Sequence, residues 1–183
     1  MTLNKLFATV LISVATLSSA SFVMAAEGSK ATYKAAEDSA DATYKADKAK
    51  CDSLSGNDKD VCSKQAKATR EHTKQDAKAM YKNTPKAAAD ARKSEADADY
   101  AVAREKCNSL AGNAKDVCVK EAKAAKTDAV ANAKARKNVT EARTDANKDK
   151  NDAAYAVAAE KCNSKAGPSK DACINAAKLQ FNQ

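Results

Sequence analysis

The six cysteines are the side chains whose spacing most clearly specifies a chemistry. They form three pairs, with 11 positions between the partners of each pair: Cys51/Cys62, Cys107/Cys118 and Cys162/Cys173. No Cys-x-x-Cys or Cys-x-x-Cys-His occurs, which argues against a thioredoxin-type redox site and excludes c-type haem attachment. A zinc site needs four ligands, and each pair offers two thiolates and no histidine. We therefore expect a structural disulfide within each pair.

Such disulfides require the chain to turn back between the two cysteines. In one continuous helix the Cα atoms of a pair would lie about 16 Å apart, whereas a disulfide needs them within about 7 Å. A glycine that can end a helix in the left-handed conformation lies midway in every copy, at Gly56, Gly112 and Gly167. The pattern predicts helix, tight turn, helix, closed by a disulfide that contributes about 2–3 kcal/mol.

The residues next to these glycines are typical of helix ends. Asparagine follows the glycine in the first two copies and predicts an N-cap, with aspartate three positions further on as in a capping box. The third copy has Pro168-Ser169 instead, which also favours a helix start. The predicted turn and cap residues are Gly56, Asn57, Asp60, Gly112, Asn113, Asp116, Gly167 and Asp171. Lysine before each first cysteine and aspartate after each turn suit the helix dipole.

Each cysteine pair belongs to a longer repeat with a period of 55–56 residues. We divide the chain into a signal peptide at 1–26 and three helical hairpin repeats at 27–84, 85–139 and 140–183. Alanine, lysine, glutamate and arginine abound while glycine and proline are scarce, a composition that strongly favours helix. The predicted fold is all-α and elongated, with three disulfide-stapled antiparallel hairpins packed in coiled-coil fashion around a small core.

The helix boundaries follow from the glycines and prolines. The chain predicts helices over 30–55, 57–83, 86–111 and 169–179, with Asn83-Thr84-Pro85 as the break between the second and third. No glycine or proline lies between Asn113 and Gly167. Repeat alignment places Asn138-Val139-Thr140 opposite the earlier break, so we expect a turn there. A single uninterrupted helix over this stretch is the alternative.

Large apolar side chains are too few for a thick core. Only 18 larger aliphatic or aromatic residues follow position 26, there is no tryptophan, and alanine contributes 44 residues to the whole chain. Tyr100, Ala103, Cys107 and Leu110 lie on one side of a helix, and the other copies keep much of this spacing. We interpret the stripe as the packed face of each hairpin rather than as a ligand or stacking site.

The first 26 residues have the pattern of a secretory signal peptide. Lys5 supplies the positive start, an apolar run follows over 6–17, and Val23-Met24-Ala25 offers a cleavage site. The run is short for a membrane span, although an N-terminal membrane anchor is the alternative. Export to an oxidising compartment agrees with paired cysteines. We therefore expect a periplasmic protein that is not integral to the membrane.

The other side chains predict no enzyme, no cofactor and no metal site. No glycine-rich phosphate loop, Gly-x-Ser-x-Gly or His-Glu-x-x-His motif occurs. His72 is the only histidine, and we interpret it as a solvated side chain. The net charge is +8, with acidic and basic residues interleaved as on a solvated helix surface. The densest basic series, read in the same way, is Lys64, Lys67, Arg70, Lys74 and Lys78. Because no aromatic residues alternate with these charges, we expect no nucleic-acid binding.

The repeat also resembles a known group of proteins. The second copy reads ADARKSEADADYAVAREKC over 89–107 and LAGNAKDVC over 110–118. It resembles small exported Ala/Lys-rich proteins of beta-proteobacteria, mostly uncharacterised and often labelled "cell envelope biogenesis protein TolA", over nearly the whole chain after the signal peptide. The chain is similar to the helical stalk of TolA itself in composition only. The resemblance implies an exported helical envelope protein and supplies no functional residues.

Three functions fit these observations. The first is a non-enzymatic helical scaffold or interaction protein of the bacterial cell envelope, which binds an unknown envelope protein. The second is a hydrophilic protectant of the desiccation type, because the chain is rich in charge and poor in core residues. The third is a binder of anionic envelope polymers such as lipopolysaccharide, because the chain is basic. Self-association is left open.

Overall fold

The computed structural model describes residues 29–183 and is all-α, without strands in that range. Helices make up 92% of it. The long helices are α1 (Lys30–Cys51), α2 (Gly56–Lys82), α3 (Pro85–Lys106), α4 (Gly112–Lys161) and α5 (Gly167–Phe181), and two short 3-10 turns follow α3 and α4, η1 (Cys107–Ser109) and η2 (Cys162–Ser164). The predicted fold class, with its three disulfides, is confirmed. The predicted signal peptide lies outside the described residues.

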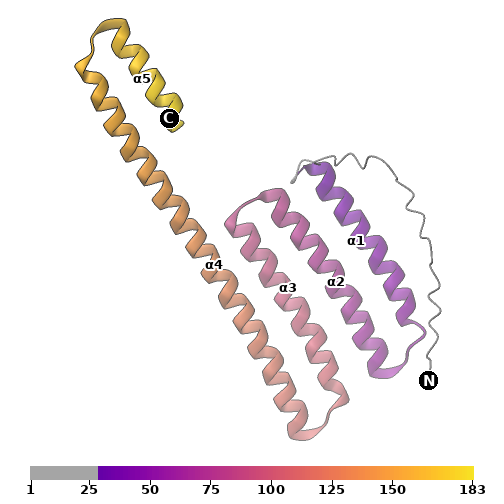
Figure 1. Ribbon diagram of the computed structural model, residues 1–183. Helices are drawn as coiled ribbons and strands as arrows, with labels where there is room; N and C mark the ends of the chain where they lie inside the picture. The colour runs from indigo at the N-terminus through magenta and orange to yellow at the C-terminus, as the bar shows by residue number, and fades with distance from the viewer. Residues whose placement is uncertain (1–28) are drawn as a thin grey trace, which may run out of the picture.

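The helices form an elongated single layer rather than a bundle around a central core (Figure 1). The main contacts all join helices that follow one another in the chain: α1 with α2, α2 with α3, α3 with α4, and α4 with α5. Figure 1 shows α3 beside the first half of α4, and α5 beside its far end. The second and third hairpins therefore share α4. None of the helices described is long and apolar enough to cross a membrane.

The turn expected at Asn138-Val139-Thr140 is wrong, because α4 continues through it as one helix of 50 residues. The corresponding break after α2 depends on residues that α4 lacks. There Asn83 adopts the left-handed conformation, with φ 44°, and Thr84 caps α3 by accepting a hydrogen bond from the backbone N–H of Ala87. Pro85 then starts α3 at a position where its missing N–H costs nothing.

Nothing in α4 stops the helix at this point. Asn138 costs only about 0.7 kcal/mol relative to alanine inside a helix, and no proline follows. Lys137 and Glu141 form an ion pair at i,i+4 across the expected turn, at 2.7 Å. Because the helix is continuous, no other described helix covers its middle, where every residue from 142 to 150 is exposed.

The buried apolar residues are small, as the composition predicted. They are nine alanines or valines and the first cysteine of each pair, in full Ala40, Cys51, Ala66, Ala68, Ala87, Ala91, Ala96, Val102, Cys107, Ala133, Cys162 and Ala177. Alanine side chains let helices approach closely but exclude little apolar surface from water. The predicted stripe is therefore only partly correct: Cys107 is fully buried, Tyr100 is half-buried and Leu110 is 43% exposed.

Candidate functional site

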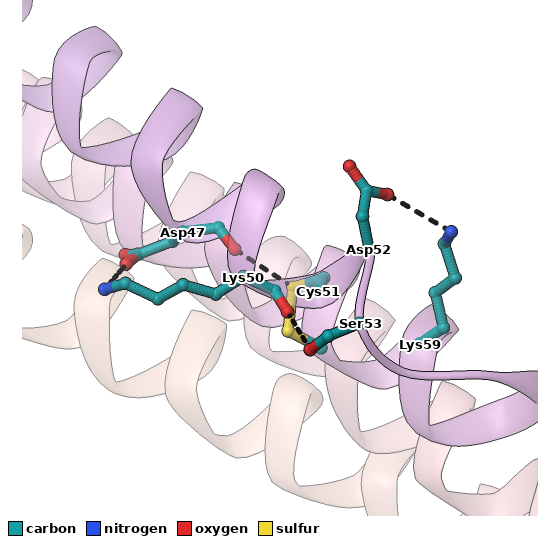
Figure 2. Close-up of a disulfide and its surroundings, with 7 residues drawn as sticks. Asp47, Lys50, Cys51, Asp52, Ser53 and Lys59 are labelled. Carbon is teal, nitrogen blue, oxygen red and sulfur yellow. Dashed lines mark hydrogen bonds and ion pairs between the residues drawn. A yellow bond between two sulfur atoms is a disulfide. The ribbon is translucent and has the colours of Figure 1, made fainter.

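The disulfides hold the closed end of each hairpin. Cys51–Cys62, Cys107–Cys118 and Cys162–Cys173 have Cα–Cα distances of 5.6, 5.7 and 5.7 Å. The first cysteine of each pair is fully buried between the two helices it joins. Figure 2 shows the first disulfide with the neighbouring turn, where Lys59 bridges back to Asp52 at 3.1 Å. Each disulfide therefore fixes the turn at the closed end of its hairpin.

The incoming helices end earlier than the glycines predicted, at or just before the first cysteine. A serine two residues after that cysteine explains the difference. The hydroxyls of Ser53, Ser109 and Ser164 each donate a hydrogen bond to the backbone carbonyl three residues before, at 2.8–2.9 Å (Figure 2 for Ser53). These hydroxyls satisfy carbonyls that a helix end otherwise leaves unpaired. The repeated Cys-x-Ser could have signalled this end.

The glycines belong to the start of the outgoing helices. Gly56, Gly112 and Gly167 have φ of +54°, +54° and +55°, and each is the first helical residue after the turn. The predicted N-caps Asn57 and Asn113 are wrong, because the caps are the residues before glycine, Ser55, Ala111 and Ala166. These caps make no side-chain hydrogen bond, so the predicted capping boxes with Asp60 and Asp116 do not form, whereas Pro168 does lie in the first turn of α5, ahead of Asp171. The left-handed glycine places the backbone of the outgoing helix without them.

The first hairpin is closed further along by a cluster of one tyrosine, one aspartate and two cations. Arg70 of α2 lies over the Tyr44 ring of α1, 5.2 Å from its centroid. Nε of Arg70 also donates to Asp41 at 2.5 Å, and Nζ of Lys74 does so at 2.9 Å. The hydrogen bond from Lys74, followed by that from Arg70, lowers the pKa of Asp41 below its ordinary 3.8. Arg70 and Lys74, two members of the basic series, thus join α2 to α1 instead of lying on a fully solvated face.

The second hairpin repeats this cluster with equivalent residues. Lys126 of α4 lies 5.3 Å from the centroid of the Tyr100 ring and 2.6 Å from Asp97 of α3. In both hairpins the aspartate and tyrosine come ten and seven positions before the first cysteine, and the cation eight positions after the second. Sequence reasoning missed the aspartates, although their recurrence was a visible signal.

The third hairpin has the same tyrosine and aspartate but a different partner. Phe181 occupies the position of the cation and meets Tyr155 edge-on, with ring centroids 6.5 Å apart. Asp152 binds Lys148 on its own helix and accepts a hydrogen bond from Gln183 at 2.9 Å, and both bonds lower its pKa. The Asn151 amide donates to the Phe181 carbonyl at 2.6 Å. In all three copies the tyrosine therefore helps to hold the two helices of the hairpin together, by contact with a cation or an aromatic ring of the opposite helix.

Polar contacts also join α2 and α3. Arg92 bridges Asp76 at 3.2 Å and Glu95 at 2.5 Å. Glu95 is only 6% exposed, and its Oε1 atom has no hydrogen-bond partner among the described residues. His72 is half-buried with the Asp99 carboxylate 3.0 Å from Nε2, a contact that lacks hydrogen-bond geometry. The His72 side chain, expected to be solvated, is therefore partly exposed, with its Nε2 atom buried.

Shallow hollows line the seam between α3 and α4. One is bordered by Ala96, Ala103, Ala122, Ala125 and Ala129 beside Tyr100 and Lys126, and another by alanines with Arg92, Arg136 and Lys137. Within residues 29–183 no group of three or more His, Cys, Asp or Glu side chains could hold a metal ion. The arrangement offers long helical faces for binding.

Comparisons with protein-family models, with curated proteins and with solved structures find no match to this chain. The internal repeat is therefore the basis for judging which of its residues belong together.

Proposed function

We propose that this protein is a non-enzymatic helical scaffold or interaction protein of the bacterial cell envelope, exported to the periplasm. The proposal rests on the single layer of helices, in which no other described helix covers the two broad faces or the outer sides of α1 and α4. Three disulfides support an oxidising compartment. They also support a role as a rigid spacer, since a layer with so few large buried side chains gains much of its order from covalent links.

Site-specific photocrosslinking in the native cell tests this proposal. A photoreactive amino acid is placed at exposed positions on α2 and α4, and adducts are analysed after release of the periplasm. The proposal predicts discrete adducts with envelope proteins from a contiguous set of positions. It also predicts that these adducts are lost in the Cys107→Ala/Cys118→Ala variant, because no disulfide then holds the turn between α3 and α4. Recovery of the protein in the cytoplasm, or no adduct from any face, would contradict it.

A binder of anionic envelope polymers is the second candidate, favoured by the charge of α4. Residues 113–140 carry seven basic and three acidic side chains. Among the described residues only Lys126 and Lys137 of these seven make ion pairs. Sedimentation with lipopolysaccharide or anionic vesicles at low ionic strength, and release by salt, would support this candidate. A Lys134→Glu/Arg136→Glu variant should then bind less, with Lys34→Glu on α1 as the control.

A further inference from the structure

We propose that α4 binds a second copy of this chain, in an antiparallel pair that exchanges the third hairpin between the two copies. The proposal goes beyond the function given above and does not depend on the compartment or on any envelope partner. It starts from the exposed stretch 142–150, which no other helix of the described residues covers. A packing partner would stabilise this segment, because helices in proteins gain most of their stability from tertiary packing.

The internal repeat indicates what should cover α4. Alignment of the second cysteines, Cys62 with Cys118, makes the first half of α4 the counterpart of α2. Alignment of the first cysteines, Cys107 with Cys162, makes its second half the counterpart of α3. In the chain α2 and α3 pack against each other through a large interface. The two halves of α4 therefore carry the counterparts of two faces that bind each other.

The exposed residues of α4 agree with this correspondence. The α3 residues Ala87 and Ala91, buried in the layer, correspond to Ala142 and Ala146, which are exposed in α4. Val102 is 5% exposed, while its counterpart Val157 is 56% exposed. The same surface that is covered in one repeat is thus bare in the next.

The continuous helix prevents the two halves of α4 from meeting within one molecule. Asp128 and Lys150 illustrate this, since 22 residues of helix separate them by about 33 Å. A second copy lying antiparallel, with the two-fold axis near residue 139, brings each half against the opposite half of the partner. The contact is then isologous and closed, as in domain-swapped dimers. Asn132 would face Asn147 of the partner, as Asp76 faces Arg92 within the chain, and Asp128 would lie within a turn of the partner's Lys150.

The charge distribution favours the same pairing. Residues 113–140 have seven basic and three acidic side chains, a net charge of +4, whereas 141–161 have four basic and five acidic ones, a net charge of −1. An antiparallel pair places each basic half against the mildly acidic half of the other copy. A parallel pair would place basic against basic.

The experiment combines mass measurement with a zero-length crosslink on the oxidised, signal-free protein. Light scattering after size exclusion should give twice the chain mass at increasing concentrations. Carbodiimide treatment of 14N- and 15N-labelled protein, unfolded and refolded as one mixture, should join Asp128 to Lys150 in peptides of mixed label. A monomeric mass would overturn the proposal. A crosslink within one label only would also overturn it, in favour of a monomer folded back at 139. Binding of an anionic polymer without a dimer would do the same.

Two variants sharpen the test. Val139→Thr/Thr140→Pro recreates the Asn-Thr-Pro turn that follows α2, so the third hairpin should fold back and the dimer should become a monomer. Asp128→Lys should weaken association about tenfold by placing like charges together, while Asp38→Lys, exposed on α1, should leave it unchanged. Association as strong as that of the parent in both Val139→Thr/Thr140→Pro and Asp128→Lys would contradict the assignment of the face.

Discussion

Removal of the third disulfide should unfold α5 without unfolding the rest of the chain. The change is Cys162→Ala/Cys173→Ala, which keeps the buried position apolar. Helix α5 has 15 residues, and within residues 29–183 its main contacts are with α4 and the turn η2. An isolated helix of that length is marginal in water. The disulfide is therefore the main reason that α5 stays beside α4.

The expected size follows from the loop that the disulfide closes. The two cysteines are 11 positions apart, and closing a loop of that length lowers the free energy of folding by about 3 kcal/mol on the chain-entropy model. A change of that size raises the local opening constant about 100-fold. Contacts of Phe181 with Tyr155 and Asn151 remain in the variant, but they are few.

Hydrogen exchange measured by mass spectrometry reports this change locally. Amides of α5 should lose about 100-fold of their protection, whereas those of α2 and α3 should keep theirs. The matched control is Cys51→Ala/Cys62→Ala, after which α1 is still held by Asp41 and by stacking of Tyr33 on Tyr81 at 5.2 Å. If α5 exchanges as slowly in the variant as in the parent, or if the whole layer exchanges faster, the reasoning is refuted.

Three further results are expected. Gly112→Ala should lower the free energy of unfolding by about 1 kcal/mol in urea melts, because φ there is +54°, and Gly112→Asn should cost less; equal losses would point to another cause. Because the pKa of Asp41 is lower in the folded chain, its ion pairs stabilise fully above its ordinary pKa of 3.8 and are lost as pH falls through the folded value. In an acid titration followed by circular dichroism, the stability of Asp41→Asn should therefore depend less on pH than that of the control Asp38→Asn. Equal pH dependence in the two variants would show that the ion pairs of Asp41 do not stabilise the fold. Glu95→Met should raise the melting temperature, because an apolar side chain then takes the place of a buried carboxylate whose Oε1 atom is unpaired. A lower melting temperature would show that the ion pair with Arg92 is needed.

Much of the fold could be predicted because it depends on local signals. Cysteine spacing with a central glycine specifies a hairpin, and an alanine-rich composition specifies helix. The positions where prediction failed depend on competition between neighbouring signals. Asn113 resembled an N-cap, but the left-handed glycine before it already starts the helix, so the side chain has no N-cap role. Asn138 resembled a turn residue, but without the proline found at 85 the helix continues.

The polar contacts across the hairpins were harder to predict because they join residues distant in sequence. Arg70 and Asp41 are 29 positions apart, and both resembled ordinary surface charges. His72 faces Asp99 only because the break at Asn83 folds α3 back on α2. Comparison of the three copies would have revealed the aspartates, since a recurring residue at a fixed distance from the cysteine indicates a shared contact.

The central claim is that the three disulfides order a thin layer of helices, and far-UV circular dichroism of oxidised residues 27–183 tests it most directly. With helix over 92% of the described residues, the account predicts a strongly helical spectrum, a cooperative thermal transition, and loss of that transition when a thiol reductant opens the disulfides. A spectrum of a mostly disordered chain in both thiol states would contradict it and would favour the hydrophilic protectant instead.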